Sequence, residues 1–282
     1  MEVLKTIDTM QAYALDQKRQ GHLIAVVPTM GYLHEGHMSL IDTARRHAEI
    51  VVVTIFVNPT QFGPNEDYNT YPRDWEHDVR LCRQHKVDAI FAPDPAAMYA
   101  PDASTWVTEE KLSRGLCAKT RPIHFRGVAT VVAKLFNAVL PDVAVFGQKD
   151  AQQAMVLKRM VRDLNFPIQM IIAPIVREED GLARSSRNKY LSAEERRAAP
   201  AIYRALSAAE AKLKADPRSD LTAVKNEISS ALTAAGGRID YVEALDSDNL
   251  EAPTETTREL LLAVAVYFGK TRLIDNVLVK IH

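Results

Sequence analysis

Two histidines near the N-terminus, His34 and His37, follow a short apolar run and precede a helical pattern. A spacing of three residues places both side chains on one face of a helix. The first turn of a helix has free N–H groups and a partial positive charge, which attract phosphate. The segment from Pro28 to His37 is therefore predicted to bind a phosphate-bearing ligand, and Gly36 lets the backbone come close to it.

Two other interpretations of these histidines remain open. They could be ordinary surface residues at the start of a helix. The segment is also similar to the HExxH zinc motif, but it reads His-Glu-Gly-His, so its histidines stand at i, i+3 rather than i, i+4. No third zinc ligand is evident in the sequence. Zinc is therefore disfavoured, and the ligands of any metal are left unknown.

A second polar segment, Asn58–Gly63, also follows an apolar run. Its Gln61 has an amide that can donate and accept hydrogen bonds, which suits a hydroxy acid. The alternative is a plain turn, which the pair Asn-Pro explains by itself.

A third segment, Phe146–Asp150, offers Lys149 as a cation that can neutralise a phosphate. Asp150 is predicted to cap the following helix, with Gln153 at the third helical position of a capping box. The carboxamide of Gln153 could equally face the ligand pocket, and both interpretations stay open.

A fourth segment, Arg177–Asn188, contains two adjacent serines and Arg187. The planar guanidinium of an arginine suits phosphate oxygens. A loop at a domain junction can also close over a nucleotide and exclude water. A charged, solvated linker is the alternative.

The elements that must position these segments are short apolar strands alternating with helices. Such alternation predicts an α/β fold, a doubly wound parallel sheet covered on both faces. The carboxyl ends of its strands share one edge, where ligands bind. The strands are expected at Leu23–Pro28, Ile50–Val57, Val87–Phe91, Val143–Phe146 and Ile168–Ile172, and the helices at about Ile7–Gln20, Gly36–Ala48, Asp74–His85, Val128–Leu140 and Asp150–Leu164.

The pattern changes beyond Pro174. A capping box at Ser192–Glu195 predicts a long alanine-rich helix to about Lys214. A second helix follows, and then strands at Ile239–Ala244, Leu261–Phe268 and Leu273–Val279. The sequence thus predicts a nucleotide-binding domain over residues 1–175 and a smaller α+β domain over residues 176–282.

Composition narrows the class of protein. The chain has 282 residues, 47% hydrophobic and 25% charged, with a net charge of −1. This balance disfavours a nucleic-acid partner, which usually requires a basic excess. The apolar runs are too short to span a membrane, and the start of the chain lacks the pattern of a signal peptide. With only Cys82 and Cys117, no disulfide framework is expected. We expect a cytoplasmic protein.

Six motifs together resemble the pantoate–β-alanine ligase family. The resemblance spans nearly the whole chain, includes the C-terminal run Arg272–Asn276, and rests on motifs at residues 28–37, 55–62, 71–73, 121–128, 146–150 and 180–188. The resemblance implies a Rossmann-like domain with a smaller C-terminal lid. It also implies a homodimer that condenses pantoate with β-alanine, using ATP as a substrate together with Mg²⁺. Pantothenate would form through a pantoyl adenylate, with release of pyrophosphate and AMP.

The same resemblance implies roles for particular residues. His37, His34, Lys149 and Arg187 would be catalytic. Gln61 and Gln153 would bind pantoate, and Gln61 would also lie near β-alanine. The ATP site would comprise Met30, Gly31, Tyr32, Leu33, His34, Glu35, Gly36, His37, Gly147, Gln148, Lys149, Asp150, Val176, Arg184, Ser185, Ser186 and Arg187.

The chain departs from the family pattern at Ile123, where glycine is usual, at Arg184, where an apolar residue is usual, and at Gln148, where glutamate is common. These changes bear on rates and affinities rather than on the reaction. Two rival functions are a nucleotidyltransferase with a similar histidine signature and an inactive ATP-binding protein. The long C-terminal region disfavours the first, and the presence of His37, Lys149 and Arg187 disfavours the second.

Overall fold

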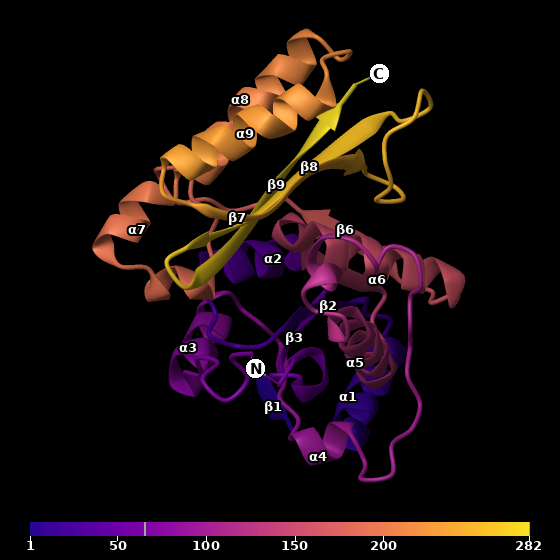
Figure 1. Ribbon diagram of the computed structural model, residues 1–282. Coiled ribbons are helices and arrows are strands. Elements are labelled where there is room, and N and C mark those ends of the chain that lie inside the picture. Colours follow the sequence, from indigo (N-terminus) through magenta and orange to yellow (C-terminus); the bar gives the residue numbers. More distant parts are fainter. Residues whose placement is uncertain (65, 282) are drawn as a thin grey trace. The chain divides into compact units, whose positions relative to one another are not determined.

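The structure is a computed structural model that describes residues 1–64 and 66–281. The chain divides into two compact units (Figure 1). The first unit comprises Met1–Gly147 and Gln153–Pro174, and the second comprises Gln148–Gln152 and Ile175–His282. The turn that follows β5 therefore belongs with the C-terminal residues, although its neighbours in the sequence belong to the first unit.

A parallel sheet organises the first unit. Its strands are ordered β1-β4-β3-β2-β5-β6, and every pairing between neighbours is parallel. The chain builds outward from β2 to one side and then returns to β5 on its other side, so the direction of winding changes between β2 and β5. The strands span β1 Glu2–Leu4, β2 Ile24–Thr29, β3 Ile50–Ile55, β4 Ala89–Phe91, β5 Val143–Gly147 and β6 Gln169–Ala173.

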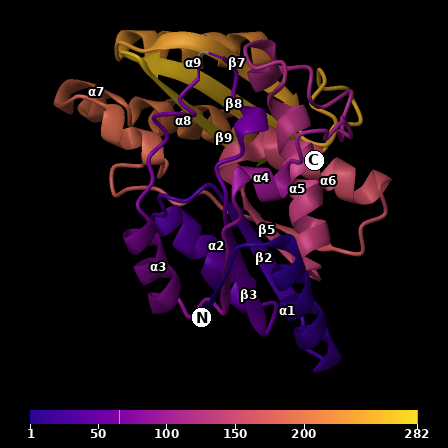
Figure 2. The same ribbon diagram turned by 90° about the horizontal axis from the view of Figure 1, so that it is seen from below.

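Helices cover both faces of this sheet because successive strand residues point to opposite sides. Ile24 and Val26 pack in the apolar cluster formed with α1 and α5, whereas Ala25 and Val27 pack in the cluster formed with α2. Figure 2 shows α1 and α5 on one side and α2 and α3 on the other. The helices are α1 Ile7–Arg19, α2 Glu35–Arg45, α3 Trp75–Gln84, α4 Pro95–Met98, α5 His124–Val139 and α6 Ala151–Asp163.

An antiparallel sheet, ordered β7-β8-β9, organises the second unit. Apolar residues of β8 and β9 pack against α8 and α9 in a separate core. The strands span β7 Arg238–Asp246, β8 Glu259–Phe268 and β9 Thr271–Lys280, and the helices span α7 Ala193–Ala198, α8 Ala201–Ala215 and α9 Leu221–Ala234. The predicted fold class, a doubly wound parallel sheet with a smaller α+β region, is confirmed.

The prediction of one long helix after the capping box is wrong. Ser192 and Glu195 do form the box, but α7 ends at Ala198 and α8 begins after Pro200. Proline has no backbone N–H and clashes with the preceding turn, so it serves as the N-cap of a new helix. The short edge strand β1 was not predicted, because three residues carry too little of a pattern.

None of the helices formed by the described residues combines the length and the apolar character that a membrane span requires.

Candidate active site

The loop after β2 is shaped by its own backbone requirements. Thr29 donates its hydroxyl to the Thr54 carbonyl (2.7 Å) and accepts the Gly31 N–H (3.1 Å). Gly31 has φ +82°, a conformation that favours glycine. A Cβ on Gly31 would lie 2.9 Å from the nearer carboxylate oxygen of Asp78. The chain therefore turns sharply here and brings its next N–H groups onto that carboxylate.

Asp78, on α3, fixes the next two residues of the loop. Its Oδ2 accepts the N–H of Tyr32 (2.8 Å) and its Oδ1 accepts the N–H of Leu33 (2.7 Å). Burial raises the pKa of this carboxyl, against the lowering effect of the two N–H donors. Asp78 was not among the predicted site residues, since it lies far from the loop in the sequence.

His34 and His37 form the N-terminal cap of α2. His34 is the N-cap residue, and its Nδ1 accepts the N–H of Gly36 (3.1 Å). The Nδ1 of His37 accepts the N–H of His34 (3.2 Å), and the ring centroids lie 4.1 Å apart. Because each Nδ1 accepts a hydrogen bond, the neutral form of each ring carries its proton on Nε2. The predicted placement of both rings at the start of one helix is confirmed.

Gln61 ends a short 3₁₀ turn, Pro59–Gln61, which begins four residues after the end of β3. Its side chain is buried, and its Oε1 accepts a hydrogen bond from the Asn58 amide (3.1 Å). Its Nε2 donates to the sulfur of Met30 (3.2 Å). Gln61 and Met30, which the family resemblance assigns to the pantoate and ATP sites respectively, are thus in contact. Because a thioether is a weak hydrogen-bond acceptor, this amide N–H can donate instead to a ligand oxygen, which is a stronger acceptor.

The start of α5 holds the backbone of Gln61 in place. The Gln61 carbonyl accepts from His124 Nδ1 (3.0 Å) and from Arg121 (3.4 Å). Arg121 also pairs with Glu66 through two hydrogen bonds of 2.8 and 2.5 Å. Burial raises the pKa of Glu66, but the hydrogen bonds and charge of Arg121 outweigh it and hold that pKa below its ordinary value. A Cβ on Gly127 would lie 2.5 Å from the Thr60 carbonyl, so only glycine permits this packing.

The Lys149 turn, Gln148–Asp150, belongs to the second unit. The side chain of Asn276, on β9, donates to the carbonyls of Gln148 (3.0 Å) and Lys149 (3.2 Å). Asp150 directly precedes α6, and Gln153 is the half-buried third residue of that helix. This position agrees equally with a capping residue and with a ligand contact.

The segment after β6 folds back on itself within the second unit. The Val176 carbonyl accepts the N–H of Arg184 (2.9 Å), and Arg177 forms a bridge with Ala183. Ser185 then caps the short turn Ser186–Tyr190 by accepting the N–H of Arg187 (3.3 Å). This hairpin places Val176 beside the start of the predicted arginine and serine cluster.

Sequence reasoning missed several residues that support these segments. Asp78 and Asn276 make contacts with residues far away in the sequence, which carry no local pattern, whereas Asn58 lies in the second polar segment but was interpreted only as part of a turn. Arg121 and His124 lie in a motif that the resemblance used, but no role followed from it. Among the described residues, no group of three or more His, Cys, Asp or Glu side chains is gathered so as to hold a metal ion.

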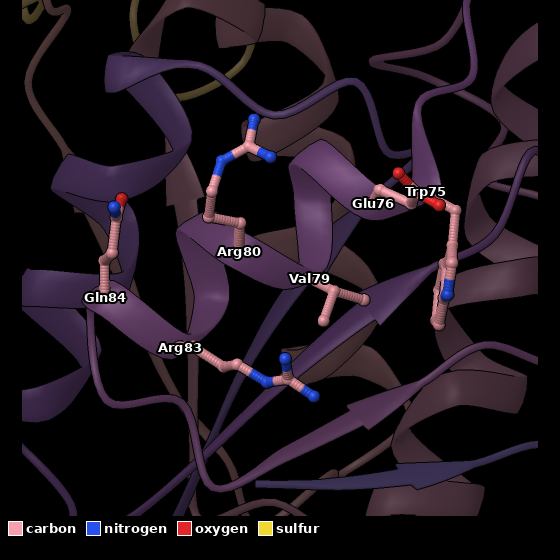
Figure 3. Close-up of a pocket in the computed structure, with 6 residues that line it drawn as sticks. All are labelled: Trp75, Glu76, Val79, Arg80, Arg83 and Gln84. Carbon is pink, nitrogen blue, oxygen red and sulfur yellow. The ribbon is translucent and has the colours of Figure 1, made fainter.

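A shallow hollow lies on one face of α3 (Figure 3). The side chains that line it project from successive turns of this helix, and none of them is a predicted site residue. They are Trp75, Glu76, Val79, Arg80, Arg83 and Gln84.

Comparison with known proteins agrees with the motifs. The pattern that defines pantoate-beta-alanine ligases matches residues 2–278. The pantothenate synthetase of Thermotoga petrophila is 52% identical over 277 residues, which cover 98% of this chain and 99% of that protein. The pantothenate synthetase of Moorella thermoacetica is 52% identical over 283 residues, which cover 100% of both.

Solved structures agree as well. The pantothenate synthetase of Thermus thermophilus matches with a TM-score of 0.90 at 42% identity, covering 98% of this chain and 99% of that one. The pantoate-beta-alanine ligase of Francisella tularensis, complexed with beta-gamma ATP and beta-alanine, matches with a TM-score of 0.79 at 34% identity, covering 99% of this chain and 97% of that one.

The doubly wound sheet and the histidine-capped helix after β2, together with the ligase family match over residues 2–278, place the protein among the ATP-dependent ligases of the α/β class. The chain belongs to the pantoate–β-alanine ligase family. It is an enzyme that joins pantoate to β-alanine in an ATP-dependent reaction, and the resemblance seen in its motifs is confirmed.

Proposed function

We propose that the ligation proceeds in two steps through a pantoyl adenylate. A carboxylate oxygen of pantoate attacks the α-phosphorus of ATP, the bond from that phosphorus to the bridging oxygen breaks, and pyrophosphate leaves. The amine of β-alanine then attacks the acyl carbon, the bond to AMP breaks, and the amine gives up a proton. Activation is needed because a carboxylate is a poor acceptor for an amine, whereas AMP leaves readily.

His34, His37, Lys149 and Arg187 act on the phosphates of ATP in this proposal. The single observation that carries it is the cap of α2, in which each Nδ1 accepts a backbone N–H. Each Nε2–H is then a donor fixed in direction by the helix start. Such preorganised donors stabilise the charge that develops on phosphate oxygens during attack. Lys149 and Arg187 supply positive charge.

The remaining ATP contacts are proposed from the segments that carry these four residues. They are Met30, Gly31, Tyr32, Leu33, Glu35, Gly36, Gly147, Gln148, Asp150, Val176, Arg184, Ser185 and Ser186. Val176 holds the adenine end through its backbone. Its carbonyl accepts the N–H of Arg184, which holds this backbone in place within the second unit.

Gln61 and Gln153 bind pantoate in this proposal, and Gln61 also lies near β-alanine. The support for Gln61 is its contact with the Met30 sulfur, which a substrate oxygen replaces with a stronger hydrogen bond. Asn58 holds the other end of the same amide and so fixes its orientation. The support for Gln153 is its half-buried position in the first turn of α6.

Mg²⁺ arrives with ATP in this proposal, coordinated by phosphate oxygens, as is usual for this ion. The family resemblance further supports a homodimer in the cytoplasm. Size-exclusion chromatography with light scattering measures the assembly, and a mass equal to one chain at working concentration would refute the dimer.

Isotope exchange tests the two-step route. The protein is given ATP, Mg²⁺, pantoate and labelled pyrophosphate, without β-alanine. We expect label to enter ATP, because adenylate formation is reversible while the intermediate stays shielded from water. Arg187→Ala should slow the exchange, since phosphate oxygens lose charge-assisted hydrogen bonds worth about 1.5–3 kcal/mol each.

Each contrary result has a distinct meaning. Exchange that requires β-alanine would show that activation and amide formation are not separate steps. Binding of ATP without exchange under either condition would favour the inactive ATP-binding protein. Detection of a dinucleotide-type product by mass spectrometry would favour the nucleotidyltransferase.

A further inference from the structure

Two polar side chains interrupt the apolar pattern of β9. Asp275 is 3% exposed and Asn276 is 2% exposed, in a strand whose neighbours Leu273, Val277 and Val279 belong to the core of the second unit. Burying a polar group is unfavourable unless its hydrogen bonds are made. The roles proposed above do not use either residue, so their partners show what they do.

The side chain of Asn276 makes three hydrogen bonds to the Lys149 turn. Its Nδ2 donates to the backbone carbonyls of Gln148 and Lys149, at 3.0 and 3.2 Å. Its Oδ1 accepts from the side chain of Gln148 (3.2 Å). Because carbonyls only accept, the two backbone contacts fix which end of the amide faces the turn. One side chain thus holds the carbonyls of the two peptide groups that flank the Cα of Lys149.

Asp275 points to the opposite face of β9, because side chains alternate along a strand. It accepts two hydrogen bonds from Arg177, at 2.6 and 3.0 Å. The Arg177 guanidinium also lies 3.8 Å from the centre of the Tyr203 ring and donates to the Gly181 carbonyl. Burial raises the pKa of Asp275, against the opposing effects of Arg177 and of the Lys149 charge.

We propose that Asn276 is a positioning residue for Lys149, which it serves by fixing the carbonyls of the turn that carries the lysine. The proposal rests on the proposed role of Lys149 at the phosphates of ATP. A lysine side chain has many rotamers, so its ammonium group is directed only if its backbone is held. The strand that carries Asn276, β9, lies at the edge of its sheet. Among the described residues, β8 is the only strand that pairs with it.

A double-mutant cycle tests the proposal in the full-length protein. The four proteins are wild type, Asn276→Ala, Lys149→Ala and the double variant, and the measured quantity is the rate of pyrophosphate–ATP exchange with pantoate. We expect Asn276→Ala to lower the rate roughly tenfold to a hundredfold, the cost of a misplaced group. In the Lys149→Ala background the same change should cost less than about threefold, because coupled residues are not additive.

Thr257→Val is the matched control. Thr257 is 1% exposed in the same unit, and its hydroxyl donates to Asp246 (2.6 Å), away from the Lys149 turn. It should lower the melting temperature as a lost buried hydrogen bond does, yet keep the exchange rate within about twofold of wild type. If Asn276→Ala does not fold, Asn276→Asp replaces it, since it leaves no cavity but presents an oxygen to both carbonyls.

Hydrogen exchange at the amides of residues 148–150 provides a readout independent of activity. We expect faster exchange in Asn276→Ala and no change in Thr257→Val. The proposal would be overturned if Asn276→Ala lowered the exchange rate by the same factor in the wild-type and the Lys149→Ala backgrounds. It would also be overturned if Asn276→Ala lowered the melting temperature but kept the wild-type exchange rate. Wild-type activity of Lys149→Ala would instead overturn the proposed function of Lys149, while amide exchange still decides whether Asn276 anchors the turn.

Discussion

Replacing Asp78 tests whether one buried carboxylate shapes the loop that precedes the histidine cap. Its two oxygens accept the N–H groups of Tyr32 and Leu33 at 2.8 and 2.7 Å, and the residue is 2% exposed. A hydrogen bond to a charged acceptor contributes about 1.5–3 kcal/mol. Asp78→Ala loses both, so we expect the free energy of unfolding to fall by about 3–6 kcal/mol.

Asp78→Asn should be milder. It keeps one acceptor oxygen and removes the unfavourable burial of a charge, so a loss of about 1–3 kcal/mol is expected at neutral pH. Both variants should also slow pyrophosphate–ATP exchange, because the loop leads into His34. Asp94→Asn is the control, since Asp94 is exposed and its side chain makes no capping hydrogen bond. It should change stability by less than about 0.5 kcal/mol.

The pH dependence of the Asp78→Asn effect has a definite sign. The pKa of Asp78 is raised in the folded protein above its ordinary value of 3.8, first because of burial. The folded state therefore holds a proton at pH values where the unfolded state has released it. The stability that this group contributes is fully present below 3.8 and is lost as pH rises through the raised pKa. The stability gap between wild type and Asp78→Asn should therefore widen as pH falls from neutral toward 4.

Denaturant titration followed by tryptophan fluorescence measures these differences. Both tryptophans, Trp75 and Trp106, lie in the first unit, so their emission reports on the unfolding of that unit. Wild-type stability of Asp78→Ala would refute the reasoning. So would losses in Asp78→Asn and Asp78→Ala that are equal and independent of pH.

Two further predictions concern residues assigned to the substrates. His37→Ala should lower the adenylation rate by roughly 10²–10³-fold with the fold retained. His37→Asn should be as slow, because its short amide can accept the His34 N–H but does not reach as far as Nε2. A wild-type rate in His37→Asn would show that His37 serves only as a helix cap. Gln153→Ala should raise the apparent KM for pantoate with little change in melting temperature; an unchanged KM with a stability loss of about 1 kcal/mol would assign Gln153 to the capping box.

The sequence by itself determined the layers of the first unit and the local form of its ligand segments. In a strand such as β2, the residues that point to one face of the sheet and those that point to the other are both apolar. Such a strand needs a sheet that is covered on both sides. The placement of His34 and His37 at the start of one helix could be predicted because residues three apart share a helical face. All the residues that define such a local pattern lie within a few positions of one another, so the pattern can be interpreted without knowing the fold.

Only the tertiary structure decided which distant residues support those segments. Asp78 reaches Tyr32 across 46 positions, and Asn276 reaches Gln148 across 128. Neither pair leaves a pattern in the sequence, because each contact depends on where the sheet brings two elements together. Pro200 is visible in the sequence, but only the structure shows that α7 ends at Ala198 with no buried residue, whereas α8 packs six residues into the core of the second unit. Hydrogen-bond partners of buried polar groups are chosen by proximity in space, which the chain acquires only on folding.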